Sequence, residues 1–186
     1  MPGQQTAAAR WPPLQVTAVW QKLEELGALL QDQLRKSDSD LVAGQLARLL
    51  VIRSCGYLEQ VVFEVARAFV FERSGGRVRT FAHTWIPEGR NPSPSFLVEW
   101  VGRFDASMAT ELEQILAADD ERLSRELYFL VDRRNRIAHG LNEGVTPRKA
   151  LDLKNISNEV ADWFILKFNP ERSVALYSAG GRRPPP

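Results

Sequence analysis

The feature that most constrains the fold is a long stretch of helical periodicity between residues 40 and 72. Apolar residues recur there at alternating spacings of four and three, which keeps them on one face of an α-helix: Val51, Cys55, Leu58, Val62, Val65 and Phe69. The sequence RSGG at 73–76 should end this helix, because glycine is common just beyond a helix C-terminus.

Helical periodicity and capping residues predict further helices on both sides of this one, and the sequence has no convincing strand pattern. Residues 77–92 are expected to form a loop. The other expected elements are a helix over 14–36, capping residues at 37–40, a helix opened by Ser93 and Pro94, a capping box at Thr110 and Glu113, a helix over about 119–139, and a final helical region from Thr146–Pro147 to about 169 with a break near Asn155.

The predicted fold is therefore all-α, an up-and-down bundle of about five to six helices. We expect one domain over residues 14–177. Residues 1–13 should form a loose leader, and residues 178–186 a loose tail rich in arginine and proline.

Composition narrows the classes of function. The chain has 186 residues and a net charge of +1, so any RNA contact must come from a local basic patch. The single cysteine, Cys55, cannot form an intrachain disulfide, which favours a cytoplasmic location. One cysteine and two histidines, His83 and His139, argue against a Cys/His zinc site, and no cofactor is predicted. No apolar run is expected to be long enough to span a bilayer, and the N-terminus lacks the apolar region of a secretory signal, so no membrane association is predicted.

The sequence VDRRNRIAHG at 131–140 places a cation on an apolar helix face. Arg134 falls in the middle of a stripe formed by Leu123, Leu127, Leu130 and Ala138. Glu59 similarly interrupts a stripe formed by Ile52, Cys55, Val62 and Ala66. Charges on apolar faces are costly unless they are satisfied, so these two residues predict either a buried ion pair or a functional site.

Each residue of this segment also has an ordinary structural explanation. Arg134 could extend to the end of the bundle or form a purely structural bridge with Glu59. His139 in a last helical turn interacts favourably with the helix dipole, and Gly140 is a common residue just beyond a helix. Taken one at a time, they do not establish any chemistry.

Read together, three residues of the segment supply what RNA cleavage without a metal requires. The 2′-hydroxyl of RNA is the nucleophile, and a histidine such as His139 can transfer protons near neutral pH. The planar fork of Arg134 can bind phosphate oxygens and stabilise added negative charge, and Asn135 can orient either partner.

The segment RRNRIAHG resembles the signature of HEPN domains, which is an arginine, four to six residues, and a histidine, often with a polar residue after the arginine. Arg134, Asn135 and His139 match this pattern. The long helix containing YLEQVVFEVARAF (57–69), a variable loop, the motif helix and a final helix after VTP are similar to the RiboL-PSP-HEPN branch over roughly residues 40–168.

The resemblance implies a symmetric homodimer in which two motifs face one cleft. It implies a metal-independent endoribonuclease of the toxin or antiviral-defence type, with Arg134 and His139 as catalytic pair, Asn135 as polar partner, and Glu59 and Arg133 as supporting residues. Some members of the family have lost catalysis. The alternative is therefore a non-catalytic helical module that dimerises and binds RNA or a partner protein, such as a nucleotidyltransferase-like antitoxin.

Two further expectations concern geometry and RNA contact. Residues 134 and 139 point about 140° apart on a regular helix, so a shared site requires an unwound helix end or a second subunit. In the loop expected over 77–92, phosphates and bases could be contacted by four residues, Arg77, Arg79, Trp85 and Arg90, together with Phe81. The competing interpretation is a solvated loop whose aromatic residues cover the end of the bundle and whose His83 lies at the surface.

Overall fold

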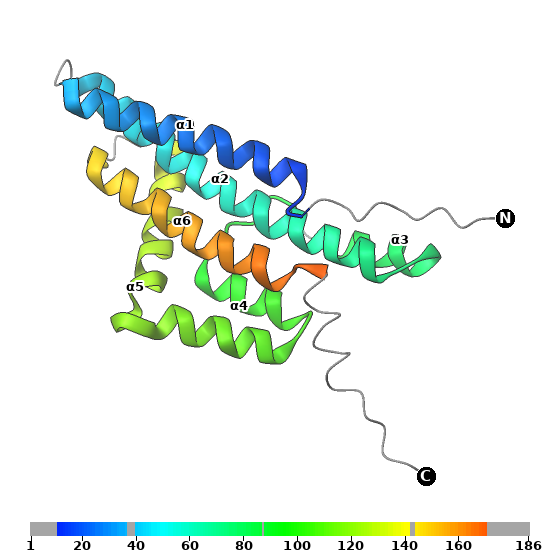
Figure 1. Cartoon of the computed structure of the whole chain (residues 1–186). Coiled ribbons are helices and arrows are strands. Elements are labelled where there is room, and N and C mark those ends of the chain that lie inside the picture. Colours follow the sequence, from blue (N-terminus) through cyan, green and yellow to red (C-terminus); the bar gives the residue numbers. More distant parts are fainter. Residues whose placement is uncertain (1–10, 37–39, 87, 142–143, 171–186) are drawn as a thin grey trace, which may run out of the picture.

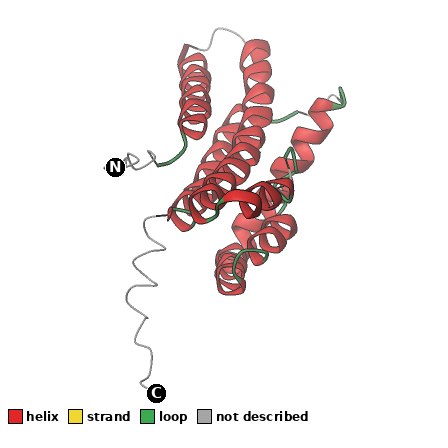
Figure 2. Cartoon of the chain, turned by 90° about the vertical axis from the view of Figure 1, so that its right-hand side faces the viewer, coloured by secondary structure: helices red, strands yellow, loops and turns green. Residues whose placement is uncertain are grey.

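The computed structural model describes residues 11–36, 40–86, 88–141 and 144–170, and all regular structure in these ranges is helical (Figures 1 and 2). Six helices follow one another: α1 (Leu14–Lys36), α2 (Asp40–Arg73), α3 (Gly76–Thr84), α4 (Pro94–Gly102), α5 (Ala106–Ala138) and α6 (Pro147–Lys167). The predicted all-α fold is confirmed.

Helix α2 is the centre of the molecule, because α1, α3, α5 and α6 all pack against it (Figure 1). Its predicted apolar face is its buried face: Val51, Cys55, Leu58, Val62 and Val65 are all within the core. Phe69 packs edge-on against Phe104 and Phe168, so aromatic rings join the C-terminal half of α2 to the residues that directly follow α4 and α6.

The expectation that no apolar segment is long enough to span a bilayer is wrong for α2. This helix has 34 residues and contains a window with a mean hydropathy of 1.3, which satisfies the length and composition of a membrane span. Its apolar character has a structural explanation, because 44% of that window is buried inside the bundle. A helix surrounded by other helices needs apolar residues on several faces.

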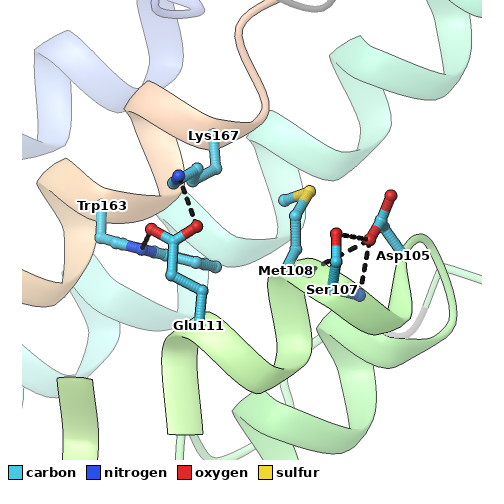
Figure 3. Close-up of polar contacts among 6 residues, drawn as sticks. All are labelled: Asp105, Ser107, Met108, Glu111, Trp163 and Lys167. Carbon is cyan, nitrogen blue, oxygen red and sulfur yellow. Dashed lines mark hydrogen bonds and ion pairs between the residues drawn. The ribbon is translucent and has the colours of Figure 1, made fainter. Parts of the chain in front are cut away.

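Helix α5 begins five residues earlier than the capping box at Thr110 and Glu113 predicts. Asp105 is the N-cap, and its Oδ1 accepts hydrogen bonds from the backbone N–H groups of Ser107 and Met108 at 2.7 and 3.1 Å (Figure 3). Thr110 lies inside the helix, where its hydroxyl donates to the carbonyl of Ala106. Asp105 is the N-cap in place of Thr110 because its carboxylate satisfies two of the unpaired N–H groups of the first turn.

Four non-helical residues, 118–121, divide α5 into two limbs that run in clearly different directions (Figure 1). Asp119, Asp120 and Glu121 have φ angles of 50°, 61° and 58°, in the left-handed region. The predicted helix start near residue 119 corresponds to this break. The first limb packs against α4, and the second, residues 122–138, crosses to α2 and α6 with Leu123, Leu127 and Leu130 buried.

Helix α6 starts as predicted, with Thr146 as N-cap accepting from the Lys149 N–H and Pro147 in the first turn. The break expected near Asn155 is wrong, because α6 is continuous over Pro147–Lys167. Its last turns are fastened to the first limb of α5: Glu111 accepts hydrogen bonds from Lys167 Nζ at 2.6 Å and from the indole of Trp163 at 3.4 Å (Figure 3).

Two expectations about irregular segments need correction. The loop predicted over 77–92 is wrong for its first part, because residues 76–84 form α3. A loose leader over residues 1–13 does not hold for Trp11, whose indole donates a 2.8 Å hydrogen bond to the carbonyl of Ile165 in α6. Residues 1–10, the tail at 178–186 and most of the capping segment at 37–40 lie outside the described residues.

Candidate active site

An ion pair joins the two longest helices at the point where the sequence places opposite charges on apolar faces. Arg134, in the second limb of α5, donates from Nη2 to Oε1 of Glu59 in the middle of α2 at 3.0 Å. The side chains are 30% and 14% exposed, respectively, so the pair lies at the edge of the core and the arginine retains access to solvent. The sequence left Arg134 and Arg53 of a neighbouring chain as alternative partners of Glu59, and the structure shows the pair with Arg134.

Asn135 holds the other arm of the same guanidinium. Its Oδ1 accepts a 3.0 Å hydrogen bond from Nη1 of Arg134. A guanidinium has five N–H donors, and among the described residues Glu59 and Asn135 engage two of them. The guanidinium is therefore held from two sides and still has donors that can bind an anion.

Cys55 lies one turn before Glu59 on α2, and its thiol is directed at Glu59 Oε1, with an Sγ–Oε1 distance of 3.7 Å. Burial raises the pKa of the Cys55 thiol to about 12, and the negative charge of Glu59 contributes to this increase. The thiol therefore stays protonated near neutral pH, and Cys55 serves as a packed core residue beside the ion pair.

His139 is the C-cap residue of α5, and its side chain is exposed. Gly140 follows with a φ of 73°, its N–H bonds to the carbonyl of Ile137, and the N–H of Leu141 bonds to the carbonyl of Arg136. These two bonds form a Schellman motif, which ends the helix and fixes the position of His139. Within the described part of the chain, no residue makes a hydrogen bond to the imidazole. Both ring nitrogens are thus available for proton transfer.

The helix around the motif is regular as far as Ala138, so the end of α5 is not unwound. Residues 134 and 139 therefore keep their angular separation of about 140°. Ala138, expected on the apolar stripe with Arg134, is instead exposed. Of the two arrangements expected to bring Arg134 and His139 into one site, an unwound helix end is not observed.

A second group of cations surrounds Phe129, one turn before the motif. The Arg133 guanidinium lies 4.8 Å from the centre of the Phe129 ring, and Lys149 Nζ of α6 lies 5.1 Å from it. Lys149 also pairs with Glu126 at 2.6 Å. Sequence reasoning missed Phe129 and Lys149. The spacing of four between Phe129 and Arg133 could have predicted their contact, because residues four apart are neighbours on a helix. Lys149 comes from another helix, so no local pattern indicated its contact with Phe129.

The residues proposed for RNA contact are located on and after α3. Arg77, Trp85 and Arg90 are exposed. Arg79 donates from Nε and Nη2 to the carbonyl of Ser74 and lies 3.9 Å from the ring centre of Phe71, so it is held in place and is less available to a ligand. His83 is half-buried. In the described ranges, no hydrogen bond or ion pair joins these residues to Arg134 or His139.

The fold and the site together define an all-α protein that carries an Arg-x4-His segment at the end of a core helix. The model of the RiboL-PSP-HEPN family matches residues 20–168. The chain belongs to the RiboL-PSP-HEPN family, and it is a HEPN-type module, a class generally associated with ribonuclease activity. Neither the curated proteins nor the solved structures contain a significant match to this chain.

Proposed function

We propose that this protein is a metal-independent endoribonuclease that cleaves single-stranded RNA. The observation that carries the proposal is the state of Arg134, which is fixed by Glu59 and Asn135 at a partly exposed position and keeps unused donors. A guanidinium that is already oriented can stabilise charge as it develops, without reorganising during the reaction.

The reaction follows from the chemistry of RNA. The 2′-oxygen forms a bond to the adjacent phosphorus as its proton passes to a base, and the bond from phosphorus to the 5′-oxygen breaks as that oxygen gains a proton. The products are a 2′,3′-cyclic phosphate and a 5′-hydroxyl. We assign proton transfer to His139, charge stabilisation on the phosphate to Arg134, and orientation of Arg134 to Asn135 and Glu59.

We further propose that the site is completed by a homodimer whose interface includes residues 134–140. This is supported by the regular helix end, which keeps Arg134 and His139 of one chain on different faces. A two-fold axis near this helix end would bring the Arg134 of one chain toward the His139 of the other, because such an interface repeats the same patch. Sedimentation at tens of micromolar, the order of concentration at which a weak dimer forms, should show the dimer.

The test compares wild type with His139→Ala on total RNA and on a single-stranded oligonucleotide, in the presence of a chelator. We expect wild type to leave 2′,3′-cyclic phosphate ends, and His139→Ala to lose about 10²–10⁴-fold in rate, the usual contribution of positioned acid–base catalysis. DNA of the same sequence should remain intact because it lacks the nucleophile. Cleavage that disappears with chelator, or that is unchanged in His139→Ala, would contradict the mechanism.

One observation favours a second candidate, a non-catalytic module that binds RNA or a partner protein such as a nucleotidyltransferase-like antitoxin. Glu59 already neutralises Arg134, which is also what a structural ion pair requires. Wild-type protein that binds RNA or a partner but leaves RNA uncut under all the conditions above would favour this module. A cytoplasmic location stays a prediction in either case.

A further inference from the structure

An aromatic pocket is lined by residues from the C-terminal part of α2, from α3 and α4, and from the segments that follow α3 and α4. Helix α3 lies at the C-terminal end of α2 (Figure 1). The pocket has a volume of about 310 Å³ and is lined by Val70, Phe81, Ala82, Trp85, Ile86, Trp100, Arg103 and Phe104. Phe81 and Trp85 are 64% and 63% exposed, and their ring centres are 5.9 Å apart with the planes tilted by 56°. Two large aromatic side chains thus stand in solvent at the mouth of a hollow.

The lining favours a flat, electron-rich ligand with a negatively charged backbone. Arg103 is the only charged residue of the lining, and its guanidinium lies 5.7 Å from the ring centre of Trp100 while pairing with exposed Glu99. Trp100 also carries a buried Nε1 with no hydrogen-bond acceptor in the described part of the chain. Arg77 is exposed and lies on α3, close in sequence to Phe81 of the pocket. Aromatic platforms combined with arginine are how proteins hold unpaired nucleic-acid bases.

A larger pocket offers a contrast. It has a volume of about 490 Å³, lies in the angle of α5, and is lined by three carboxylates, Glu99, Glu113 and Glu121. Negative charge of this kind repels a phosphate backbone. The lining of the aromatic pocket has no carboxylate, and its one cation, Arg103, pairs with Glu99, so of the two pockets it is the one that repels a phosphate backbone less.

The aromatic pocket and the candidate active site lie along the same side of α2, and Ala66, between them on that side, is fully buried. A strand that joins the two sites therefore passes over the residues that cover α2 there. Glu59, Phe63 and Val70 lie within about 40° of each other around the helix, and Glu59 and Val70 are about 16 Å apart along its axis. A small pocket of about 140 Å³, lined in part by Glu59, Phe63 and Glu88, adjoins the Glu59 end of this stretch. A stacked strand advances about 3.4 Å per nucleotide, so about five stacked nucleotides, or fewer in an extended strand, span this distance. The two carboxylates of the small pocket require the phosphates there to face away from α2, which turns the bases toward the protein.

We propose that the aromatic pocket is a base-binding subsite, in which Trp85 and Phe81 stack on an unpaired base several nucleotides from the phosphate bound by Arg134. This inference rests on the proposed function, since it assigns a second contact to the same RNA substrate. It predicts that the protein prefers single strands long enough to reach from the motif to α3. It also gives Phe81 of α3 and Trp85 at the C-cap of α3 a role in substrate affinity.

Binding is tested in the His139→Ala background, where RNA should stay intact, with a fluorescent single strand about 12 nucleotides long, which is within the range of ordinary site sizes. Trp85→Ala should weaken binding about 5- to 150-fold, the range for losing one base stack. Trp85→Phe should restore most of the affinity, because the ring still stacks. Val78→Ala is the matched control: Val78 is exposed on the same helix but does not line the pocket.

Cleavage by the otherwise wild-type protein separates the subsite from the chemistry. Trp85→Ala should raise KM for the long strand and leave kcat unchanged, and it should cleave a dinucleotide at the wild-type rate, since a dinucleotide cannot reach the pocket. If the wild type cleaves RNA but Trp85→Ala binds and cleaves the long strand like wild type, the subsite is wrong while the proposed function stands. If Trp85→Ala instead abolishes self-association, the pocket is a protein-binding surface and the inference fails. A wild-type protein that neither cuts nor binds RNA overturns both.

Discussion

Among the ion pairs that join different helices, the pair of Lys154 and Glu24 and the pair of Arg134 and Glu59 differ in a way that shows what marks a candidate site. Lys154 of α6 pairs with Glu24 of α1 at 2.6 Å, and Asn158 donates to the second oxygen of Glu24 at 2.8 Å. The Lys154 side chain is only 10% exposed. This pair is closed, because both carboxylate oxygens are occupied and the ammonium is enclosed by protein.

The surroundings of the closed pair are shaped to receive it. Gly27 of α1 faces Lys154, and a Cβ atom at this position would lie 3.1 Å from Lys154 Cδ. The absence of a side chain at Gly27 thus leaves space for the lysine to cross to Glu24. The pair of Arg134 and Glu59 differs, because Arg134 is 30% exposed and keeps donors that no described residue uses. A charge on an apolar helix face therefore indicates an ion pair, and of these two pairs only the one with Arg134, the open pair, combines unused donors on the cation with exposure of the cation to solvent.

The largest effect should come from changing the geometry of the open pair while keeping its charge. Arg134→Lys should reduce the rate of RNA cleavage about 10²–10³-fold, because an ammonium cannot reproduce the planar fork on a phosphate. Thermal stability should change little, since a lysine can still approach Glu59. Arg122→Lys is the control, because Arg122 lies on the same limb of α5, where it forms an exposed ion pair with Glu159 of α6. A rate that falls equally in both variants would contradict the assignment of Arg134.

Neutralising the carboxylate of each pair should separate stability from activity. Glu24→Gln should lower the free energy of unfolding by about 1–2 kcal/mol, because it weakens charge-assisted hydrogen bonds to Lys154 and Asn158, and it should leave the cleavage rate per folded molecule unchanged. Glu59→Gln should lower the cleavage rate and also cost about 1 kcal/mol or more in stability. Denaturant unfolding and initial rates measure both quantities. Equal effects of the two variants on the rate would remove the distinction between open and closed pairs.

The pair of Lys154 and Glu24 should also affect how the free energy of unfolding depends on pH. Burial acts to raise the pKa of Glu24, but the hydrogen bonds from Lys154 and Asn158 outweigh it and hold the pKa below the ordinary range. A carboxylate with a lowered folded-state pKa contributes stability above its unfolded pKa and loses it as the pH falls through the folded value. Wild type should therefore lose stability between about pH 5 and pH 3, and Glu24→Gln should lose less over that range. An identical decline in both proteins would show that Glu24 is not the group responsible.

The smallest effect concerns the bend in α5, which contributes to neither pair. Glu121 has a φ of 58°, which is strained for a residue with a Cβ atom. Glu121→Gly should raise stability by about 0.5–1 kcal/mol through relief of this strain, partly offset by the greater freedom of glycine when unfolded. Glu113→Gly in the regular first limb should instead cost about 1 kcal/mol. The opposite signs in thermal unfolding would confirm the bend, and equal losses would argue that residue 121 is helical in solution.

The parts of the fold that the sequence revealed are those with long, local patterns. The 34 residues of α2 repeat one apolar period often enough to define its length and its buried face. The same helical period placed Glu59 and Arg134 on apolar stripes, and because an unsatisfied charge there is costly, their ion pair was among the alternatives that the sequence predicted.

The parts that the sequence did not reveal depend on weak or non-local interactions. Val78, Phe81 and Trp85 have spacings of three and four, but α3 buries no side chain, so its helical pattern was hidden among polar residues. The bend after Ala118 has no local signal, because alanine, aspartate and glutamate are all compatible with a helix. Lys149 reaches Phe129 from α6, and a contact between distant segments leaves no mark on either one.

The central claim is that Arg134 of one chain and His139 of another act in one site, and mixing two inactive variants tests it most directly. Arg134→Lys and His139→Ala should each be nearly inactive alone. When their subunits exchange, each mixed dimer keeps one intact Arg134 and one intact His139 in opposite chains, so activity should return to at most about one quarter of wild type. Native mass spectrometry shows that mixed dimers have formed. Mixed dimers that form but remain as inactive as the separate variants would contradict the account.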